Sequence, residues 1–449
     1  MRRGLSYKWV VLINTTVGVV MSSLDGSILT ISLPNITRSI NASVVEVMWV
    51  VMGYSLITTS LILPIARLAD MKGRVRLYNL GFAIFTLASA LCGFAQTGAQ
   101  LVVFRLVQGV GSALLISNST ALIIDAVPDR ERGAALGFNM MAGTTAFVTG
   151  TVVGGVITQF LSWRYIFFLN LPLGLFAAVW CFLKLHETSE PDRKAHFDLG
   201  GIVTFPLAVA AILGGLTWVT LGHWGEPITY ALFVAGFGLL IIFGLIERGV
   251  AEPMMDLALF RIRVFWAGNV AVFLNALSRG ATLFIMSWYF QSVLQDQPVV
   301  AGLKTLPLAA SMTIAAPFAG RMADRFSSRL LATLGLAGTG LAMLAMALFP
   351  LHVPYVLLAG AFVLMGFGNA FFNTPNTSAV MGSVPASRRG VAASARNLLF
   401  NSGQTMAIAL TMAIVATTIS YSTLVALFAG SAEVSHSLDA AAFMDGLHK

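Results

Sequence analysis

Long apolar runs alternate with short polar turns along the whole chain. A membrane-spanning helix needs about 20 predominantly apolar residues, and thirteen runs approach or exceed that length. Six lie at 9–33, 44–66, 77–95, 98–124, 133–158 and 163–184, two at 199–221 and 227–247, and five at 264–291, 299–320, 329–349, 354–381 and 391–419. The pattern predicts an all-α polytopic membrane protein.

The polar turns repeat, which indicates two related halves. Residues 64–78 (PIARLADMKGRVRLY) and 317–329 (PFAGRMADRFSSR) share an R-x-A-D motif at an offset of 254 residues (67 to 321). Residues 128–133 (PDRERG) and 385–390 (PASRRG) repeat at nearly the same offset. Internal repeats of this kind are typical of membrane transporters. The first six and the last five runs align as halves, so the seventh and eighth form an inserted pair.

This alignment predicts three segments. Residues 1–184 form an N-terminal six-helix bundle, and residues 264–449 form a C-terminal bundle in which five spans are visible and a sixth is missing. Residues 185–263 hold a polar, proline-containing linker, the inserted pair, and a connector at 247–264. The connector alternates apolar and charged residues, so we expect an amphipathic segment on the membrane surface, with a plain loop as the alternative. A fourteenth span is expected beyond residue 449.

Composition supports the membrane assignment. The 449-residue chain is 57% hydrophobic and 10% charged, which excludes a soluble globule of this size. Its two cysteines, Cys92 and Cys181, lie in different apolar runs, so no disulfide framework is expected. We find no P-loop, metal-ligand cluster or G-x-S-x-G motif. An enzyme, a cofactor and a metal site therefore have no support in the sequence.

The net charge of +8 reflects topology rather than nucleic-acid binding. Most of the 27 lysines and arginines lie at the N-terminus and in every second loop, whereas the opposite loops hold almost none beyond Arg38 and Arg164. Cytoplasmic loops are the ones enriched in lysine and arginine. We therefore expect a multi-pass protein of the cell membrane, monomeric, with a cytoplasmic N-terminus.

Ionisable residues inside spans cost about 2.5–3.5 kcal/mol each on insertion scales, so each is a functional candidate. Asp25 lies about 13 Å from the outer end of the first run, and Arg105 about 10 Å from the same end of the fourth. At this similar depth Arg105 would stabilise the charged carboxylate, and its displacement would favour protonation. The pair is thus a candidate for proton coupling. The alternative is a static ion pair that orients two helices.

The same offset superposes Arg279 on Asp25, so the halves carry opposite charges at equivalent positions. A central cavity with these two residues on facing walls could bind a zwitterion, an anion, or a cation that displaces the arginine. We expect Gln108, Asn275 and Tyr289 to line the same substrate cavity. An arginine satisfied by neighbouring carbonyl groups is the alternative.

The repeated turn carries a candidate conformational latch. Arg74 follows Asp70 by four residues, and Asp125 ends the fourth run on the same side of the membrane, so Arg74 could bridge both carboxylates. Gly73 permits a tight turn. The second copy keeps Asp324 but has Ser328 in place of the arginine, so its latch should be weaker.

Four motifs resemble those of the major facilitator superfamily, specifically its fourteen-span drug:proton antiporters. They are LDGSILTISLP (24–34), ARLADMKGRVR (66–76), RLVQGVG (105–111) and GTVVGG (150–155). Ala66 replaces the usual first glycine of the loop motif. Gly150, Gly154 and Gly155 match the antiporter motif of the fifth helix, where Thr151 replaces its usual proline.

The resemblance implies the major facilitator fold, with two six-helix bundles, alternating access between them, and the inserted helix pair. It also implies proton antiport through Asp25 and Arg105, with Asp70, Arg74 and Asp125 as the latch. We expect proton-coupled export of hydrophobic, cationic, drug-like compounds. Transport of an endogenous anionic or zwitterionic metabolite or lipid is the first alternative, and a non-transporting membrane receptor is the second.

Overall fold

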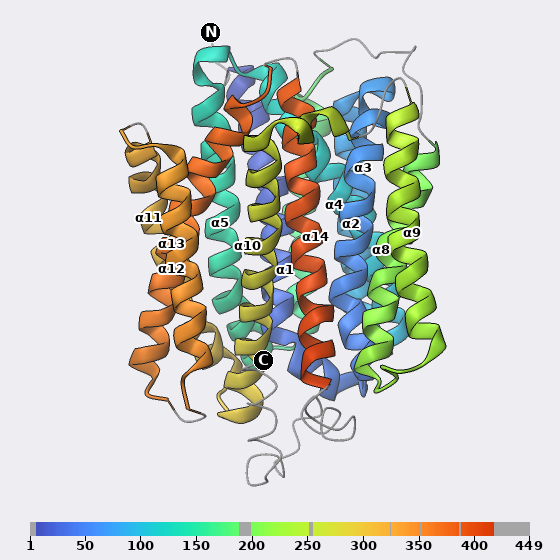
Figure 1. Cartoon of the computed structure of the whole chain (residues 1–449). Coiled ribbons are helices and arrows are strands. Elements are labelled where there is room, and N and C mark those ends of the chain that lie inside the picture. The colour runs from blue at the N-terminus through green and yellow to red at the C-terminus, as the bar shows by residue number, and fades with distance from the viewer. Residues whose placement is uncertain are drawn as a thin grey trace.

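The computed structural model describes residues 6–187, 199–250, 255–323, 325–350, 353–385 and 388–416, and these form a bundle of long helices (Figure 1). Thirteen of the described helical segments are long and apolar enough to cross a membrane. They coincide with the thirteen runs predicted from the sequence. We call the face at which α1 begins the N-terminal face, and the other the opposite face.

Seven helices make up the first part of the chain. They are α1 (Tyr7–Ile40), α2 (Val44–Lys72), α3 (Arg74–Phe94), α4 (Gly98–Ala126), α5 (Asp129–Phe160), α6 (Arg164–Phe168) and α7 (Asn170–Lys184). The last two are nearly continuous and together form the sixth predicted span. The chain thus crosses between the two faces six times before the linker.

Local sequence signals set the ends of these helices. The Ser43 side chain accepts a hydrogen bond from the Glu46 amide, while the Glu46 carboxylate accepts one from the Ser43 amide, which is a capping box at the start of α2. Gly73 alone separates α2 from α3 and adopts φ 104°, a conformation that side chains disfavour. The tight turn predicted there is present.

The inserted pair consists of α8 (Leu199–Thr220) and α9 (Pro227–Gly249). Helix α8 packs against α2 and α14, so the pair flanks the place where these two helices meet (Figure 1). A short 3₁₀ helix, η1 (Leu257–Arg261), precedes α10 and buries Leu259. Residues 251–254 of the predicted connector lie outside the described residues, and its position on a membrane surface stays a prediction.

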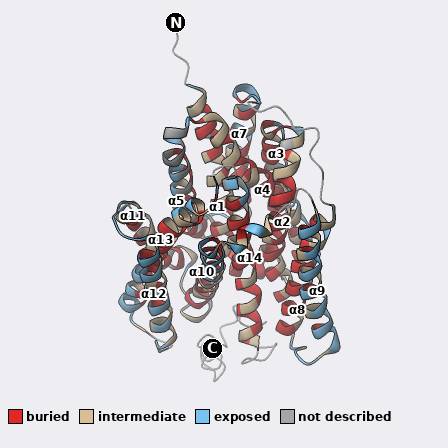
Figure 2. Ribbon diagram, turned by 45° about the horizontal axis from the view of Figure 1, so that its top comes forward, coloured by how far each residue is buried: buried red, intermediate tan, exposed pale blue. Residues whose placement is uncertain are grey.

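The second half contains α10 (Arg263–Trp288), the π-helical turn η2 (Tyr289–Val293), α11 (Pro298–Ala323), α12 (Ser328–Ala347), α13 (Tyr355–Gly382) and α14 (Arg389–Ala416). Helix α2 is the most buried span, whereas α9 and α12 are the least buried. Figure 2 shows the same contrast, with exposed residues along α9 and α12. The core therefore lies where the two halves meet.

The pseudo-symmetry leaves one position open in the second half. In the first half α7 packs against α1 and α3, with Gly174 against Met21 and Thr86. At the offset of 254, Met21 and Thr86 correspond to Asn275 of α10 and Gly340 of α12. Both of these residues line a groove of about 380 Å³. No helix from the described part of the chain covers this groove. The sixth span of the second half stays a prediction, because residues 417–449 lie outside the described residues.

The two halves are joined at the opposite face. The Gln159 side chain of α5 donates to Oε1 of Gln297 at 2.6 Å. In α10 and η2, Ser287 Oγ donates to the Thr30 carbonyl at 3.1 Å and Gln291 Nε2 donates to the Ile31 carbonyl at 2.9 Å. These contacts join α1 to α10 and η2, and the last turn of α5 to the residue before α11.

Candidate functional site

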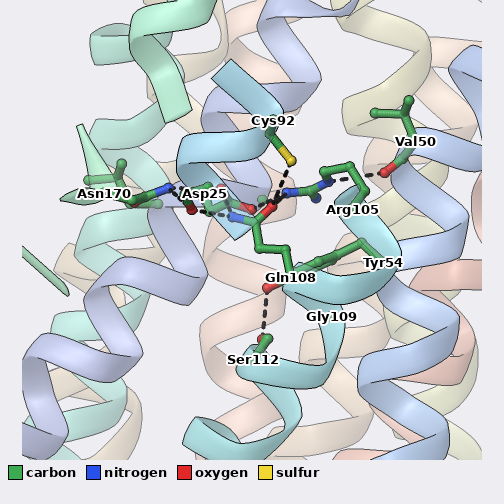
Figure 3. Close-up of polar contacts among 12 residues, drawn as sticks. Asp25, Val50, Tyr54, Cys92, Arg105, Gln108, Gly109, Ser112 and Asn170 are labelled. Atoms are coloured by element: carbon green, nitrogen blue, oxygen red, sulfur yellow. Dashed lines mark hydrogen bonds and ion pairs between the residues drawn. The ribbon is translucent and has the colours of Figure 1, made fainter. Parts of the chain in front are cut away.

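The centre of the first half holds a buried ion pair between α1 and α4. Nη1 of Arg105 lies 2.6 Å from Oδ2 of Asp25, and the two side chains are 1% and 2% exposed. The structure thus brings together the two residues that the sequence placed at similar depth (Figure 3). Because the pair is dry, removing either partner would leave an uncompensated buried charge, which costs about 3–5 kcal/mol.

Amide side chains complete the coordination of the Asp25 carboxylate. Gln108 Nε2 and Asn170 Nδ2 donate to Oδ1 at 2.9 and 3.0 Å. Both amides also donate to the Ser89 hydroxyl of α3, at 2.7 and 3.4 Å. Four helices therefore meet on one carboxylate and its immediate partners, so a change at Asp25 acts on the packing of the whole first half.

The guanidinium of Arg105 is held from the other side by α2. Its Nε donates to the Val50 carbonyl at 3.2 Å, and its carbon Cζ lies 4.1 Å from the ring centroid of Tyr54. The Tyr54 hydroxyl donates to Ser112 Oγ at 2.8 Å. Arg105 therefore has partners besides Asp25, which would hold it in place when the carboxylate is neutralised by a proton.

Two of the candidate latch residues, Arg74 and Asp125, are in contact at the N-terminal face. Nη1 of Arg74 lies 2.6 Å from Oδ2 of Asp125, and these side chains are 27% and 15% exposed. The carboxylate of Glu187 joins the same turn, since it accepts a hydrogen bond from the Arg76 amide at 3.0 Å. The Asp70 side chain and Asp324 lie outside the described residues, so their parts in the latch stay predictions.

Arg279 of α10 lies between the halves. Its guanidinium carbon is 5.2 Å from the ring centroid of Phe147 in α5 and 5.2 Å from that of Phe400 in α14. Its Nε has no hydrogen-bond partner among the described residues. The arginine is therefore held by aromatic faces from both halves, a cation–π arrangement. It makes no ion pair with Asp25, which is occupied by Arg105.

The other predicted cavity residues do not gather around Arg279. Gln108 is fully buried beside Asp25 in the first half. Asn275 is 4% exposed and lines the groove between α10 and α12. Tyr289 is 3% exposed and packs on Phe290 in η2. Their contact with a substrate stays a prediction.

The glycines of the α5 motif point in two directions. A Cβ at Gly150 or Gly154 would meet Ser27 or the Ile28 backbone of α1. A Cβ at Gly155 would lie 2.6 Å from the Pro298 carbonyl oxygen of α11. One side of helix α5 therefore packs closely against α1 of its own half, and an adjacent side packs closely against α11 of the other half.

Two polar residues of this region were not singled out from the sequence. Asn170, in the run 163–184, donates to Asp25, and Arg396, in the run 391–419, is 7% exposed. A polar side chain within an apolar run was the available signal for both. Neither residue could be assigned a partner without the tertiary structure.

The family model and the similar proteins of known sequence all point to one family of membrane transporters. The Major Facilitator Superfamily model matches residues 15–271 and 268–435. The chain is 30% identical over 406 residues to the riboflavin transporter RibZ of Clostridioides difficile (strain 630), covering 89% of this chain and 87% of that protein. It is 34% identical over 385 residues to the multidrug resistance protein Stp of Mycobacterium tuberculosis (strain ATCC 25618 / H37Rv), covering 85% and 71%.

Solved structures share the fold. A bacterial homologue of the human lysosomal transporter Spinster, in an inward-facing and unoccupied conformation, superposes with a TM-score of 0.66 at 16% identity. The superposition covers 99% of this chain and 93% of that one. The likeness therefore extends over the full arrangement of helices.

Proposed function

The chain belongs to the Major Facilitator Superfamily and is a membrane transporter, and from this premise we propose that it exports hydrophobic small molecules in exchange for protons. The Asp25 network is the observation that carries the proposal. It places a single carboxylate, with one arginine partner, among four helices of a membrane-embedded bundle. Intramembrane carboxylates of this kind act in proton relays of transporters.

The position of Asp25 supports coupling to movement of the halves. Asp25 shares α1 with Thr30 and Ile31, whose carbonyl groups accept the hydrogen bonds from the second half. Five residues along a helix correspond to about 8 Å, so the carboxylate and the closing contact lie within one rigid stretch. A Cβ at the next residue, Gly26, would meet no atom within 4 Å, so α1 borders open space on the side of Gly26 while the Asp25 carboxylate itself is enclosed.

The proposed cycle uses two states of the carboxylate. In the state described here Asp25 is paired with Arg105 and the opposite face is closed. Proton uptake would neutralise Asp25, weaken its attraction for Arg105 and loosen the packing of α1 against α4. Substrate that binds between the halves would favour the reverse change, so that one species leaves as the other enters. Differential affinity for the two states is what drives such a cycle.

Two classes of cargo fit the charged residues of the bundle. The names of RibZ and Stp support small organic compounds as cargo. The sequence favoured cations, and a cation could compete with Arg105 for Asp25. A second candidate, an anionic or zwitterionic organic molecule, is favoured by Arg279, which carries its charge between the halves without an acidic partner among the described residues.

Transport into sealed vesicles tests the proposal. The full chain is reconstituted, a pH gradient is imposed, and uptake is measured for a panel that contains ethidium, riboflavin and an aromatic carboxylate. We expect at least one compound to accumulate with the gradient and to stop accumulating when the gradient is collapsed. Uptake that follows only the compound's own gradient would contradict proton coupling. Binding without any uptake would contradict transport of that panel.

A further inference from the structure

The membrane-embedded part of the second half carries positive charge without matching negative charge. Between residues 263 and 416 the sequence contains only two acidic residues, Asp296 and Asp324. Asp296 lies beyond the end of η2 and pairs with Lys304 at 2.5 Å. Asp324 falls in the sequence between the end of α11 and the start of α12 and lies outside the described residues. Neither is within a span, whereas Arg279 and Arg396 both are.

Among the described residues, the two carboxylates of the first half that lie in the interiors or at the N-terminal-face ends of its spans already have arginine partners. Asp25 is paired with Arg105 at 2.6 Å, and Asp125 with Arg74 at 2.6 Å. The halves therefore differ at equivalent positions. The negative charge of Asp25 is balanced by Arg105 of its own half, while Arg279 has no ion-pair partner in the part of the chain that the structure describes. An unbalanced charge inside a membrane span is unfavourable unless something supplies the opposite charge.

Arg396 of α14 is a second arginine within the spans of the second half. It is 7% exposed, its guanidinium donates to Asn373 Oδ1 of α13 at 3.2 Å, and its Nε has no partner among the described residues. Phe400 follows it by four residues on α14, so the two side chains lie on the same face of the helix. The ring of Phe400 in turn contacts Arg279. Phe400 thus contacts Arg279 and shares a helix face with Arg396.

We propose that Arg279 and Arg396, with the rings of Phe147 and Phe400, form a subsite for the carboxylate and the aromatic body of a planar aromatic acid. Guanidinium groups pair with carboxylates through parallel N–H donors. Aromatic rings stack on a flat apolar body, while the carboxylate of the same molecule pairs with the guanidinium. Two guanidinium groups for the carboxylate and two phenyl rings for the flat body match the two ends of such a molecule.

The subsite spans both halves, which gives it a place in transport. Phe147 belongs to α5 of the first half, and the other three residues belong to α10 and α14 of the second. A ligand held among them would contact both halves in this state and would lose one set of contacts when the halves separate. This inference rests on the proposed transport function and names its substrate class.

Binding of matched probes tests the subsite without requiring transport. The probes are 2-anthracenecarboxylate and its neutral counterpart 2-(hydroxymethyl)anthracene, titrated by fluorescence anisotropy against the full chain in detergent. In the wild type we expect the carboxylate to bind at least about fivefold more tightly than the alcohol, the weakest effect of one unit charge at about 4 Å. Equal affinities in the wild type would overturn the proposal, and this arm needs no variant.

Variants locate the effect. Arg279→Gln and Arg396→Gln should each weaken binding of the carboxylate probe by at least about fivefold. The affinity for the alcohol probe should stay within about twofold of the wild-type value. Arg279→Lys should restore part of the preference, because it keeps the charge. Arg263→Gln is the matched control, since it removes an exposed arginine from the first position of the same helix. Equal loss for both probes would show damage to packing and would overturn the assignment of charge recognition.

The binding test of the subsite and the transport test of the proposed function can fail independently. Carboxylate preference without pH-driven uptake would support the subsite and contradict proton-coupled export. Uptake driven by the gradient with no preference for the carboxylate would support export and overturn the subsite. The two measurements use the same full-length protein but different readouts.

Discussion

Replacement of Gly155 by alanine should shift the protein away from the state that is closed at the opposite face. A Cβ at this position would lie 2.6 Å from the Pro298 carbonyl oxygen and 2.9 Å from the Val299 Cα, both in the backbone of α11. Ordinary contacts of a Cβ begin at about 3.4 Å, and a backbone cannot turn aside as a side chain can. The two helices would have to move apart.

The size of this population shift is set by the cost of the clash, which is present only in the closed state. Overpacking of this kind costs about 1–3 kcal/mol. Alanine also favours a helix over glycine by about 1 kcal/mol, but this gain is present in every state and cancels. Because Gly155 and Pro298 belong to different halves, the clash acts only on the closed state. Its population relative to the alternative should fall by about 5- to 150-fold.

Distance measurement between spin labels reports this shift. Labels at Leu161→Cys and Leu348→Cys are suitable, since these residues are 65% and 75% exposed at the opposite-face ends of α5 and α12. The native Cys92 and Cys181 are fully buried and should not react. Gly155→Ala should move the distance distribution to longer values. Gly302→Ala should do the same, because its Cβ would lie 2.6 Å from the Thr151 carbonyl oxygen across the same joint.

Gly137→Ala is the matched control, because it lies on the same helix and its Cβ would meet no atom within 4 Å. It should leave the distribution unchanged. The reasoning would be refuted by an unchanged distribution in a well-folded Gly155→Ala protein. It would also be refuted if Gly137→Ala produced the same shift, since the effect would then come from helix propensity rather than from the contact between halves.

Two further predictions concern charged residues. Arg74→Ala and Asp125→Ala should each disturb closure at the N-terminal face and be non-additive by about 0.5–3 kcal/mol, because they break one 2.6 Å ion pair; additive effects in a double-mutant cycle on accessibility labelling would count against the latch. Arg279→Gln should raise transport of permanent cations relative to neutral compounds, because a nearby unit charge costs a cation about 1–4 kcal/mol. An unchanged transport ratio at matched protein level would remove Arg279 from the substrate path.

Much of the fold was predictable because its signal is local. A span is a run of apolar residues of fixed length, so all thirteen were visible in the sequence. The contact of Asp25 with Arg105 was also accessible, since depth along a helix follows from residue number. The contact of Arg74 with Asp125 followed in the same way from their shared face. The proton role of Asp25 remains a prediction that the geometry supports.

The remaining features depend on how helices are rotated about their axes. Asn170 reaches Asp25 because α7 packs with Gly174 against Met21 and Thr86, a contact between distant segments. Asn275 faces α12 rather than the other half for a similar reason. Apolar spans show little amphipathic pattern, since lipid and core are both apolar, so periodicity does not reveal which side faces which neighbour.

Proton movement in response to substrate is the most direct test of coupling through Asp25. Sealed vesicles that hold the full chain and an internal pH-sensitive dye are exposed to a compound that the wild type accumulates, and the same is done for Asp25→Asn at matched protein level. The account predicts a substrate-dependent pH change in the wild type and none in Asp25→Asn, with the variant still folded and able to bind the compound. A pH change of wild-type size in Asp25→Asn would contradict it.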